Sequence, residues 1–595
     1  RAGVSYLQGV ARLRPGASIK SAAAEMEVLD RQYNQENPKA PDGGPNVSML
    51  AGNLQELTVA DLRTRLFFLS GAVGLVLLIA CANVAGLLLS RSLMRRKEIA
   101  VRTALGARSS DIVRQLLTES VLLALVAGAL GLGFGLAGTR FLAALSALGL
   151  PQGTTVAIDW RVLSFTLTLS ALTGIMFGIF PALQLLRTDM NSTLREEGQG
   201  TSAGHRRVQI KSVLVVLQVA MSVMLVIASG LLVRSFYRLL QVDPGFDSQS
   251  VLTMNVSLPT VKYAKADQQI EFFDELLRKV SAVPGVQSTS ISAALPLSPI
   301  RITPILPEGQ PAVPLAERPF IIIEAISPSF LETMRIPLRS GRAFTRADNA
   351  QAPRVVIINQ ALARRFWPGQ DPVGRHIAVG RQTPSEIVGV AADVRNRGIA
   401  QPPQPQLYLP FPQLPWANMN LFVRTAPEPH SMAPVVRAQV AAVDPDQPVT
   451  AIQTVDELMD GSRAQARSTA LLLGAFSAIA LLLAVVGIYG VLAYSVAQRR
   501  KELGIRLALG AEKSDILRLV VRQGLTLTAT GIVLGLLAAL ALSQVMSSLL
   551  YKVGTHDLTT FVLAPVLFLL IAVVASYLPA RGATKVDPTE ALRGA

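Results

Sequence analysis

The chain has 595 residues, of which 50% are hydrophobic and 16% are charged, and its mean hydropathy is +0.41. This composition excludes a disordered chain and is unusual for a soluble enzyme. The length exceeds that of one typical domain. The single cysteine, Cys81, excludes an intrachain disulfide and a cysteine-based zinc cluster. The net charge of +16 fits either nucleic-acid binding or basic membrane loops, and the placement of the charges decides between them.

Long stretches without Asp, Glu, Lys or Arg predict membrane spans, because a spanning helix needs roughly 20 mostly apolar residues. In chain order, seven such stretches cover residues 66–90, 120–139, 162–186, 212–233, 468–498, 523–551 and 558–580. One or two could belong to buried helices of a soluble protein, but seven predict a multi-pass α-helical membrane protein that lies in a lipid bilayer.

The short loops differ in charge. Basic residues gather in loops 91–119, 187–211 and 499–522 and in the tail, whereas loops 140–161 and 552–557 hold few. The positive-inside rule therefore places the basic loops and the C-terminus in the cytoplasm, and the N-terminal segment and the large region 240–465 outside. Because the basic excess belongs to cytoplasmic loops, we expect no nucleic-acid partner.

An internal duplication is visible in two of the basic loops. RRKEIAVRTALGARSSDIVR (95–114) aligns without a gap with RRKELGIRLALGAEKSDILR (499–518). Self-similarity at a fixed offset indicates two copies of one unit. The second copy has an opening span, an external domain and three spans, whereas the first shows only the end of an external domain and three spans. We therefore expect an N-terminally truncated sequence whose parent has eight spans.

These observations divide the chain into five segments. They are a remnant of the first external domain (1–62), a first three-span domain (63–211), an opening span (212–239), a second external domain (240–465) and a second three-span domain (466–595). The external domain has an α+β pattern with turns rich in Pro and Gly. Strands are predicted at 251–258, 286–293, 320–326, 354–358 and 386–391, and helices at 268–282, 359–366 and 431–443. No metal-ligating or nucleophilic group of residues stands out in it.

The repeated basic segment has the pattern of a short helix followed by a second one. Glu98 and Arg102 stand at i and i+4 in the favourable order, as do Glu502 and Arg506. A glycine that can end the helix follows in each copy, and the pairs Ser110-Asp111 and Ser514-Asp515 suit the N-cap and first turn of the next helix.

Two interpretations of this segment stay open on the residues alone. It is either a basic helix lying on anionic lipid headgroups or a docking helix that fits a groove of a cytoplasmic partner. One copy per repeat suits a two-fold partner. The candidate docking residues are Glu98, Arg102, Leu105, Gly106 and Asp111 in the first copy and Glu502, Arg506, Leu509, Gly510 and Asp515 in the second.

Several long motifs resemble one family. RRKEIAVRTALGARSSDIVRQLLTES (95–120) resembles the cytoplasmic loop of FtsX-like ABC permeases of the MacB type. FLETMRIPLRSGRAFTRAD (330–348) and VVIINQALARRFWPGQDPVGRHI (355–377) resemble the MacB-type periplasmic core domain, and DPTEALRGA (587–595) resembles the usual C-terminus. The layout is similar to the acidobacterial-type duplicated permeases, often called orphan permeases.

This resemblance implies two tandem FtsX-like permease units in a bacterial inner membrane, with the large α+β domain in the periplasm. It implies a cytoplasmic ABC ATPase dimer beneath them as partner, and a periplasmic adaptor or outer-membrane channel as a further candidate partner. The dipeptide Gly-Lys never occurs, so the sequence has no phosphate loop, and we expect ATP on the partner and no cofactor, metal or catalytic residue on this chain.

The function expected from the resemblance is that of a permease subunit, not an enzyme, of a MacB-like exporter or mechanotransmitter. Such a machine couples ATP hydrolysis to motion of periplasmic domains. The alternative is an FtsX-like regulator or sensor that acts on a periplasmic partner without transport. An intramembrane enzyme is disfavoured because no predicted span contains His, Asp or Glu. A secondary transporter is disfavoured by the large external domain and by the lack of charged residues within the spans.

Overall fold

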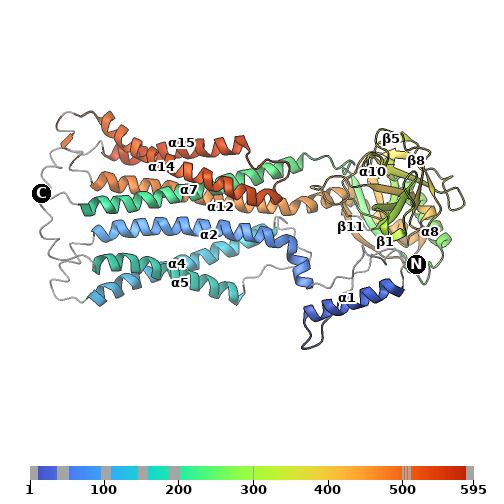
Figure 1. Cartoon of the computed structure of the whole chain (residues 1–595), viewed down its shortest axis with the longest axis horizontal. Coiled ribbons are helices and arrows are strands. Elements are labelled where there is room, and N and C mark those ends of the chain that lie inside the picture. The colour runs from blue at the N-terminus through green and yellow to red at the C-terminus, as the bar shows by residue number, and fades with distance from the viewer. Residues whose placement is uncertain are drawn as a thin grey trace. The chain divides into compact units, whose positions relative to one another are not determined.

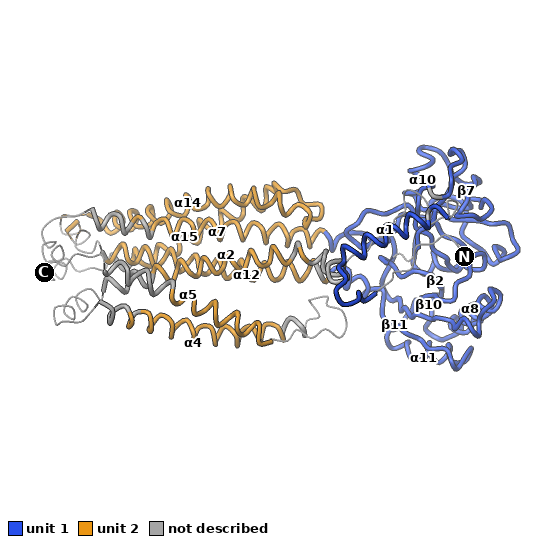
Figure 2. The backbone as a smooth tube through the Cα atoms, turned by 60° about the horizontal axis from the view of Figure 1, so that its bottom comes forward, with its two compact units in different colours: residues 1–61, 239–463 blue, residues 62–238, 464–595 orange. Residues whose placement is uncertain are grey.

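The computed structural model describes residues 11–36, 53–94, 109–144, 159–186, 202–298, 301–498, 502, 505–506, 509 and 511–583. The chain forms two compact units, shown in Figure 2. Unit 1 consists of residues 1–61 and 239–463, and unit 2 of residues 62–238 and 464–595.

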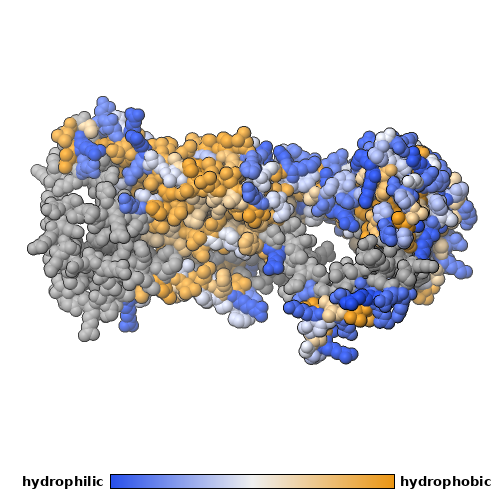
Figure 3. Space-filling model, in the orientation of Figure 1, coloured by the Kyte–Doolittle hydropathy of each residue, from blue (hydrophilic) through white to orange (hydrophobic). Residues whose placement is uncertain are grey.

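Long helices build unit 2 (Figure 1). They are α2 (Leu54–Met94), α4 (Ser109–Ala144), α5 (Trp160–Leu186), α7 (Ser202–Leu240), α12 (Val455–Gln498), α14 (Lys513–Val545) and α15 (Leu558–Ala583), with the short 3-10 helix η3 (Met546–Leu549) after α14. Apolar residues cover their surfaces in Figure 3, as expected for helices that face lipid.

Six of the predicted spans are confirmed as helices long and apolar enough to cross a membrane. These stretches are Leu66–Gly86, Leu117–Arg140, Ser212–Leu240, Ala466–Ala497, Lys513–Leu549 and Leu558–Arg581. The seventh predicted span, 162–186, falls on α5, a continuous helix of 27 residues whose side chains are described only as far as Ile175.

Small residues let the helices of unit 2 approach one another closely. Gly531 and Gly535 of α14 face Val219 and Val223 of α7, and a Cβ atom on either glycine would come within 2.8 Å of a valine Cβ. Close backbone approach of this kind is how helices pack where the surrounding solvent is as apolar as their own side chains.

Unit 1 contains helix α1 (Ile19–Glu36) and an 11-stranded sheet that has two parts. The first part is antiparallel, in the order β11 (Val449–Thr454), β1 (Val251–Ser257), β10 (Asn418–Thr425) and β2 (Val286–Ser292). Helices α8 (Ala266–Ser281) and α11 (Pro429–Val443) supply apolar side chains to its core. Phe272, Phe273, Leu276 and Val280 lie on one face of α8 at helical spacing and are buried there.

The second part closes on itself. Strands β4 (Phe320–Ile326), β3 (Ile302–Pro307), β7 (His376–Val379), β8 (Ser385–Ala391), β6 (Val355–Asn359) and β9 (Gln406–Pro410) pair in this order, and β9 pairs back onto β4. We call this the six-stranded ring. The remaining short elements are β5 (Leu338–Gly341), which pairs with β8, α9 (Phe330–Thr333), α10 (Gln360–Phe366), η1 (Leu315–Glu317) and η2 (Phe411–Gln413).

The α+β prediction for this region is confirmed, with small shifts at element ends. Each predicted strand and helix has a counterpart within two residues of its predicted ends. The predicted helix at 359–366 begins one residue later because Asn359 is its N-cap, and the Asn359 side chain accepts a hydrogen bond from the Leu362 N–H.

Candidate functional site

The predicted docking residues of the first repeat lie almost entirely outside the described part of the chain. Glu98, Arg102, Leu105 and Gly106 fall between α2 and α4, within residues that the structure does not describe. Asp111 lies in the first turn of α4, and its side chain is also outside the described residues. The geometry of this segment must therefore come from the second copy.

In the second repeat, the predicted ion pair forms. The Arg506 guanidinium lies 2.7 Å from the Glu502 carboxylate, and the two side chains are 48% and 49% exposed. A half-exposed i, i+4 pair stabilises a helix by only about 0.3–0.5 kcal/mol. The pair therefore contributes little to stability, and half of each side chain stays accessible to another partner.

Apolar side chains follow this pair on the surface. The Leu509 side chain is 83% exposed and that of Ile505 is 42% exposed. The Leu509 N–H donates to the Ile505 carbonyl at 3.0 Å, the spacing of a helical hydrogen bond. Full burial of one leucine side chain is worth roughly 1.5–3 kcal/mol, so covering Leu509 would favour association with an apolar groove or a membrane surface. Gly510 lies outside the described residues.

The start of α14 differs from the sequence prediction. Its N-cap is Glu512 and the helix begins at Lys513, so Ser514 is not the cap. The Ser514 hydroxyl instead donates to the Glu512 carboxylate at 3.0 Å, and the Asp515 carboxylate accepts from the Glu512 N–H at 3.2 Å. Acidic side chains at the N-terminal end of a helix interact favourably with the positive pole of the helix dipole and so stabilise the helix. Asp515 therefore has a structural role in the helix start, whatever partner it also contacts.

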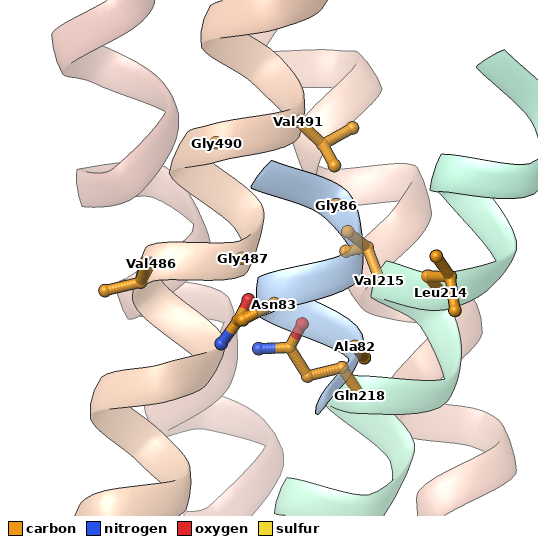
Figure 4. Close-up of a pocket in the computed structure, with 10 residues that line it drawn as sticks. All are labelled: Ala82, Asn83, Gly86, Leu214, Val215, Gln218, Val486, Gly487, Gly490 and Val491. Carbon is orange, nitrogen blue, oxygen red and sulfur yellow. The ribbon is translucent and has the colours of Figure 1, made fainter. Parts of the chain in front are cut away.

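Within the apolar part of unit 2, side-chain amides join three helices. Asn83 of α2 and Gln218 of α7 both donate to the backbone carbonyl of Leu483 on α12, at 2.8 and 2.5 Å. Figure 4 shows both amides directed at α12 beside Gly487. A Cβ atom on Gly487 would lie 2.3 Å from the Gln218 Oε1 atom, so a larger residue at this position would displace the Gln218 amide from the contact.

The same contact relates equivalent positions of the two repeats. The alignment of residue 95 with residue 499 also pairs residue 83 with 487 and residue 86 with 490. Asn83, Gly86, Gly487 and Gly490 line one hollow between α2 and α12 (Figure 4). The two repeats therefore meet through equivalent faces of two equivalent helices, α2 and α12, as the subunits of a symmetric dimer do.

A second polar contact ties α7 to the segment between α14 and α15. Arg234 of α7 forms an ion pair with Asp557, and the Ser235 hydroxyl accepts from the Tyr551 N–H at 2.8 Å. Asp557 also accepts from the Thr560 N–H at 3.1 Å at the start of α15. Although burial raises the pKa of Asp557, the hydrogen bonds from Thr560 and Arg234 hold it below its ordinary value.

The sequence reasoning did not single out Asn83, Gln218, Gly487 or the Arg234–Asp557 pair. A search for charged residues and histidine inside the spans passes over amide side chains. An Asn and a Gln within otherwise apolar stretches were the signal that could have identified the first contact, because polar groups in lipid need partners.

Two family models match the chain. The model described as FtsX-like permease C-terminal matches twice, at residues 70–190 and 474–588. The model described as MacB-like periplasmic core domain matches residues 212–457. The double match confirms the internal duplication, because both matches begin at positions that the repeat alignment makes equivalent.

Curated relatives match less than half of the chain. The pyoverdine export ATP-binding/permease protein PvdT of Pseudomonas aeruginosa is 28% identical over 44% of this chain and 41% of its own length. The uncharacterized ABC transporter permease YknZ of Bacillus subtilis is 27% identical over 46% of this chain and 69% of its own. The macrolide export ATP-binding/permease protein MacB of an Azoarcus strain is 27% identical over 43% and 40%. The chain thus spans about two fifths of the length of the ATP-binding/permease relatives it matches.

Solved structures of a periplasmic region and of an extracellular domain each match about a third of the chain. The periplasmic region of MacB from Actinobacillus actinomycetemcomitans is 12% identical, covers 37% of this chain and 95% of that chain, and has a TM-score of 0.26. The extracellular domain of YknZ from Gram-positive bacteria is 18% identical, covers 34% and 100%, and has a TM-score of 0.24.

Proposed function

The chain is a MacB- and FtsX-like ABC permease of the inner membrane, and we propose that it is the permease subunit of an exporter or mechanotransmitter driven by a separate cytoplasmic ATPase. Several relatives carry an ATP-binding part and a permease in one protein, by their names. Residues 1–595 contain no G-x-x-x-x-G-K-[ST] phosphate loop. In this proposal ATP therefore binds to the partner, and this chain converts its hydrolysis into motion of the periplasmic domain.

The observation that carries the proposal is the duplication of one basic segment within a single chain. An ATPase dimer offers two equivalent surfaces, and a permease with two equivalent segments can occupy both. The symmetric contact of α2 with α12 at Asn83 and Gly487 supports such a pairing of the two repeats.

The second copy suggests how docking is divided among the residues. Glu502 and Arg506 offer opposite charges on a half-exposed helical turn, and the exposed Leu509 side chain can fill an apolar groove. The cap formed by Glu512 and Asp515 fixes where α14 begins, so force applied to the segment reaches α14 directly. We assign the corresponding roles to Glu98, Arg102, Leu105 and Asp111 by the repeat alignment.

Affinity isolation from gently crosslinked native membranes tests this proposal. We expect an ABC ATPase to co-purify in stoichiometric amounts and to be lost from a Glu98→Arg/Glu502→Arg variant. A matched control exchanges the pair in the second copy, Glu502→Arg with Arg506→Glu, which keeps an i, i+4 ion pair of the same net charge while reversing the order of the two charges. Loss of the ATPase in this control as well would show that the partner reads charge rather than helix stability.

An unchanged amount of ATPase in the double charge reversal would reject these segments as the docking site. The wild-type protein could instead co-purify with the ATPase and a periplasmic enzyme but with no exported cargo. That result would replace export by the regulator alternative, and the proposed coupling to ATP hydrolysis would remain.

A further inference from the structure

Helices α4 and α14 occupy equivalent places in the two repeats but differ in how much of their surface is covered. Both begin at positions that the repeat alignment makes equivalent, and α4 lies at the edge of unit 2 with α5 beside it (Figures 1 and 2). Small residues of α14 at a spacing of four are buried, namely Gly531, Gly535 and Ala539. Their equivalents on α4 are also small but are exposed, and we call them the α4 stripe: Ala127, Gly131 and Gly135.

Helix α7 covers the small residues of α14. Its Val219 and Val223 side chains lie so close that a Cβ atom on Gly531 or Gly535 would come within 2.8 Å of a valine Cβ. On α4, by contrast, a Cβ atom on Gly131 would meet nothing within 4 Å. A stripe of small residues on a membrane helix lets another helix approach its backbone closely. Among the described residues, the first repeat therefore presents, uncovered, the surface that α7 occupies in the second.

The next helix of each repeat shows the same difference at its outer end. Helices α5 and α15 begin directly after Asp159 and Asp557, and the two family matches end at residues 190 and 588, so one offset relates these helices. In the second repeat, a Cβ atom on Gly230 of α7 would lie 2.8 Å from Thr560 Cγ2.

The charges at these outer ends complete the comparison. Asp557 pairs with Arg234 of α7. Its equivalent Asp159 is exposed and accepts only from the backbone N–H groups of Arg161 and Val162, with no basic side chain paired to it in the described part of the chain. Val162, the equivalent of Thr560, is 44% exposed. The groups that hold α7 in the second repeat thus have uncovered counterparts on both α4 and α5.

We propose that α4 and α5 bind a further membrane-spanning helix that has the residue pattern of α7. This helix presents two β-branched residues four positions apart to the α4 stripe. A glycine seven positions after the second of them faces Val162, and an arginine four positions after the glycine pairs with Asp159. A small-residue stripe alone accepts many helices, whereas the glycine and the arginine restrict the occupant to this spacing and this charge. The inference rests on the internal repeat and does not depend on the proposed ATPase.

Disulfide crosslinking of the full chain to a synthetic α7 peptide in lipid nanodiscs tests the proposal. The peptide has the sequence of residues 208–239 with Val219→Cys, and the chain carries Cys81→Ala with Ala127→Cys. The matched control is Ala129→Cys, because Ala129 is also exposed on α4 but its equivalent, Val533, is 57% exposed rather than covered by α7. A disulfide needs Cβ atoms roughly 3.5–4.5 Å apart, so we expect on the order of tenfold more product at position 127 than at position 129.

Variants of the Ala127→Cys chain test the individual contacts. Gly131→Ile should abolish the crosslink, because the added side chain fills the α4 stripe. Gly133→Ile should leave it unchanged, because the equivalent residue Leu537 is 60% exposed in the second repeat. Asp159→Arg should raise the peptide concentration for half-maximal crosslinking roughly fivefold, and a peptide with Arg234→Asp should restore it.

Several results would overturn the proposal. Equal products at positions 127 and 129, or no product at either while circular dichroism shows the peptide inserted as a helix, would leave only lipid on the α4 stripe. A disulfide between two copies of the Ala127→Cys chain in place of the peptide adduct would assign the stripe to a second copy. Failure of the Arg234→Asp peptide to restore binding to Asp159→Arg would refute the assigned residue pattern.

Discussion

Asn83 on α2 lies against Gly487 on α12, and these two residues occupy the same position in the two repeats. The Asn83 amide donates to the Leu483 carbonyl one turn before Gly487, and a Cβ atom on Gly487 would lie 2.8 Å from Asn83 Oδ1. One repeat therefore supplies a polar side chain where the other supplies none. The difference lets an otherwise symmetric contact include the amide of Gln218 as well.

Replacing Gly487 with alanine should loosen this contact. The added methyl group would collide with the Gln218 amide, and overpacking of this kind costs typically about 1–3 kcal/mol. The measurement is the thermal unfolding temperature of the protein in lipid nanodiscs. Gly490→Ala is the matched control, since a Cβ atom there meets nothing within 4 Å. Equal shifts for the two variants would argue against the tight contact at Gly487.

Asp557, which directly precedes α15, should contribute more to stability than Asp159, which directly precedes α5. Both begin a helix, because Asp159 accepts from the Val162 N–H at 3.0 Å just as Asp557 accepts from Thr560. Only Asp557 also pairs with Arg234, whose side chain is 34% exposed. We expect Asp557→Asn to destabilise the protein by roughly 1 kcal/mol more than Asp159→Asn, measured by thermal unfolding at pH 7.

The pH dependence of this difference has a defined sign. The folded-state pKa of Asp557 is lowered, so its contribution is fully present above the unfolded-state pKa of about 3.9 and is lost as the pH falls through the folded-state value. The gap between the two variants should therefore close below about pH 4. A gap that widens on acidification would contradict the assigned ion pair.

Glu324, a buried residue of β4, should have the opposite effect on stability. Its folded-state pKa of about 7 exceeds the ordinary glutamate value of 4.5, so the folded protein binds the extra proton and stability falls as the pH rises between these values. Glutamine resembles the protonated acid. We expect Glu324→Gln to match the wild type near pH 4.5 and to exceed its stability by up to about 3 kcal/mol above pH 7. Unfolding temperatures of both proteins across this range check the prediction, and parallel pH curves would refute it.

The orientation of the chain can be tested with single cysteines. In a Cys81→Ala background, a membrane-impermeant maleimide should label Val261→Cys in intact spheroplasts, because Val261 is 96% exposed in unit 1. It should label Leu509→Cys only after the membrane is permeabilised. Labelling of Leu509→Cys in intact spheroplasts would reverse the topology expected from the positive-inside rule.

Much of the fold could be predicted from the sequence because a membrane imposes a length on every span. A run of apolar residues without charge is visible in one dimension, and strands such as Phe320–Ile326 are runs of β-branched and apolar residues interrupted only by Glu324. Strands β3 and β9 were not predicted, since β3 contains Pro304 and β9 ends at Pro410. Proline is uncommon in a paired strand, yet both segments pair within the six-stranded ring, where Pro304 lies opposite Phe320 and Pro410 opposite Ile326.

The candidate site could be predicted only in part. Repetition of the basic segment makes Glu502 and Arg506 conspicuous, and their spacing alone predicts the ion pair. Glu512 and Ser514 were both possible N-cap residues of α14, and the sequence spacing does not distinguish between them.

The most direct test of the proposed coupling is a photo-crosslinking amino acid placed at Leu509 in living cells, with Val261 as the control position. If the basic segment docks a separate ATPase, the probe at Leu509 captures one nucleotide-binding ABC ATPase, and the probe at Val261 does not. Capture of lipid alone at Leu509, in cells that make the full-length protein at normal levels, would contradict the account and leave the segment as an interfacial helix.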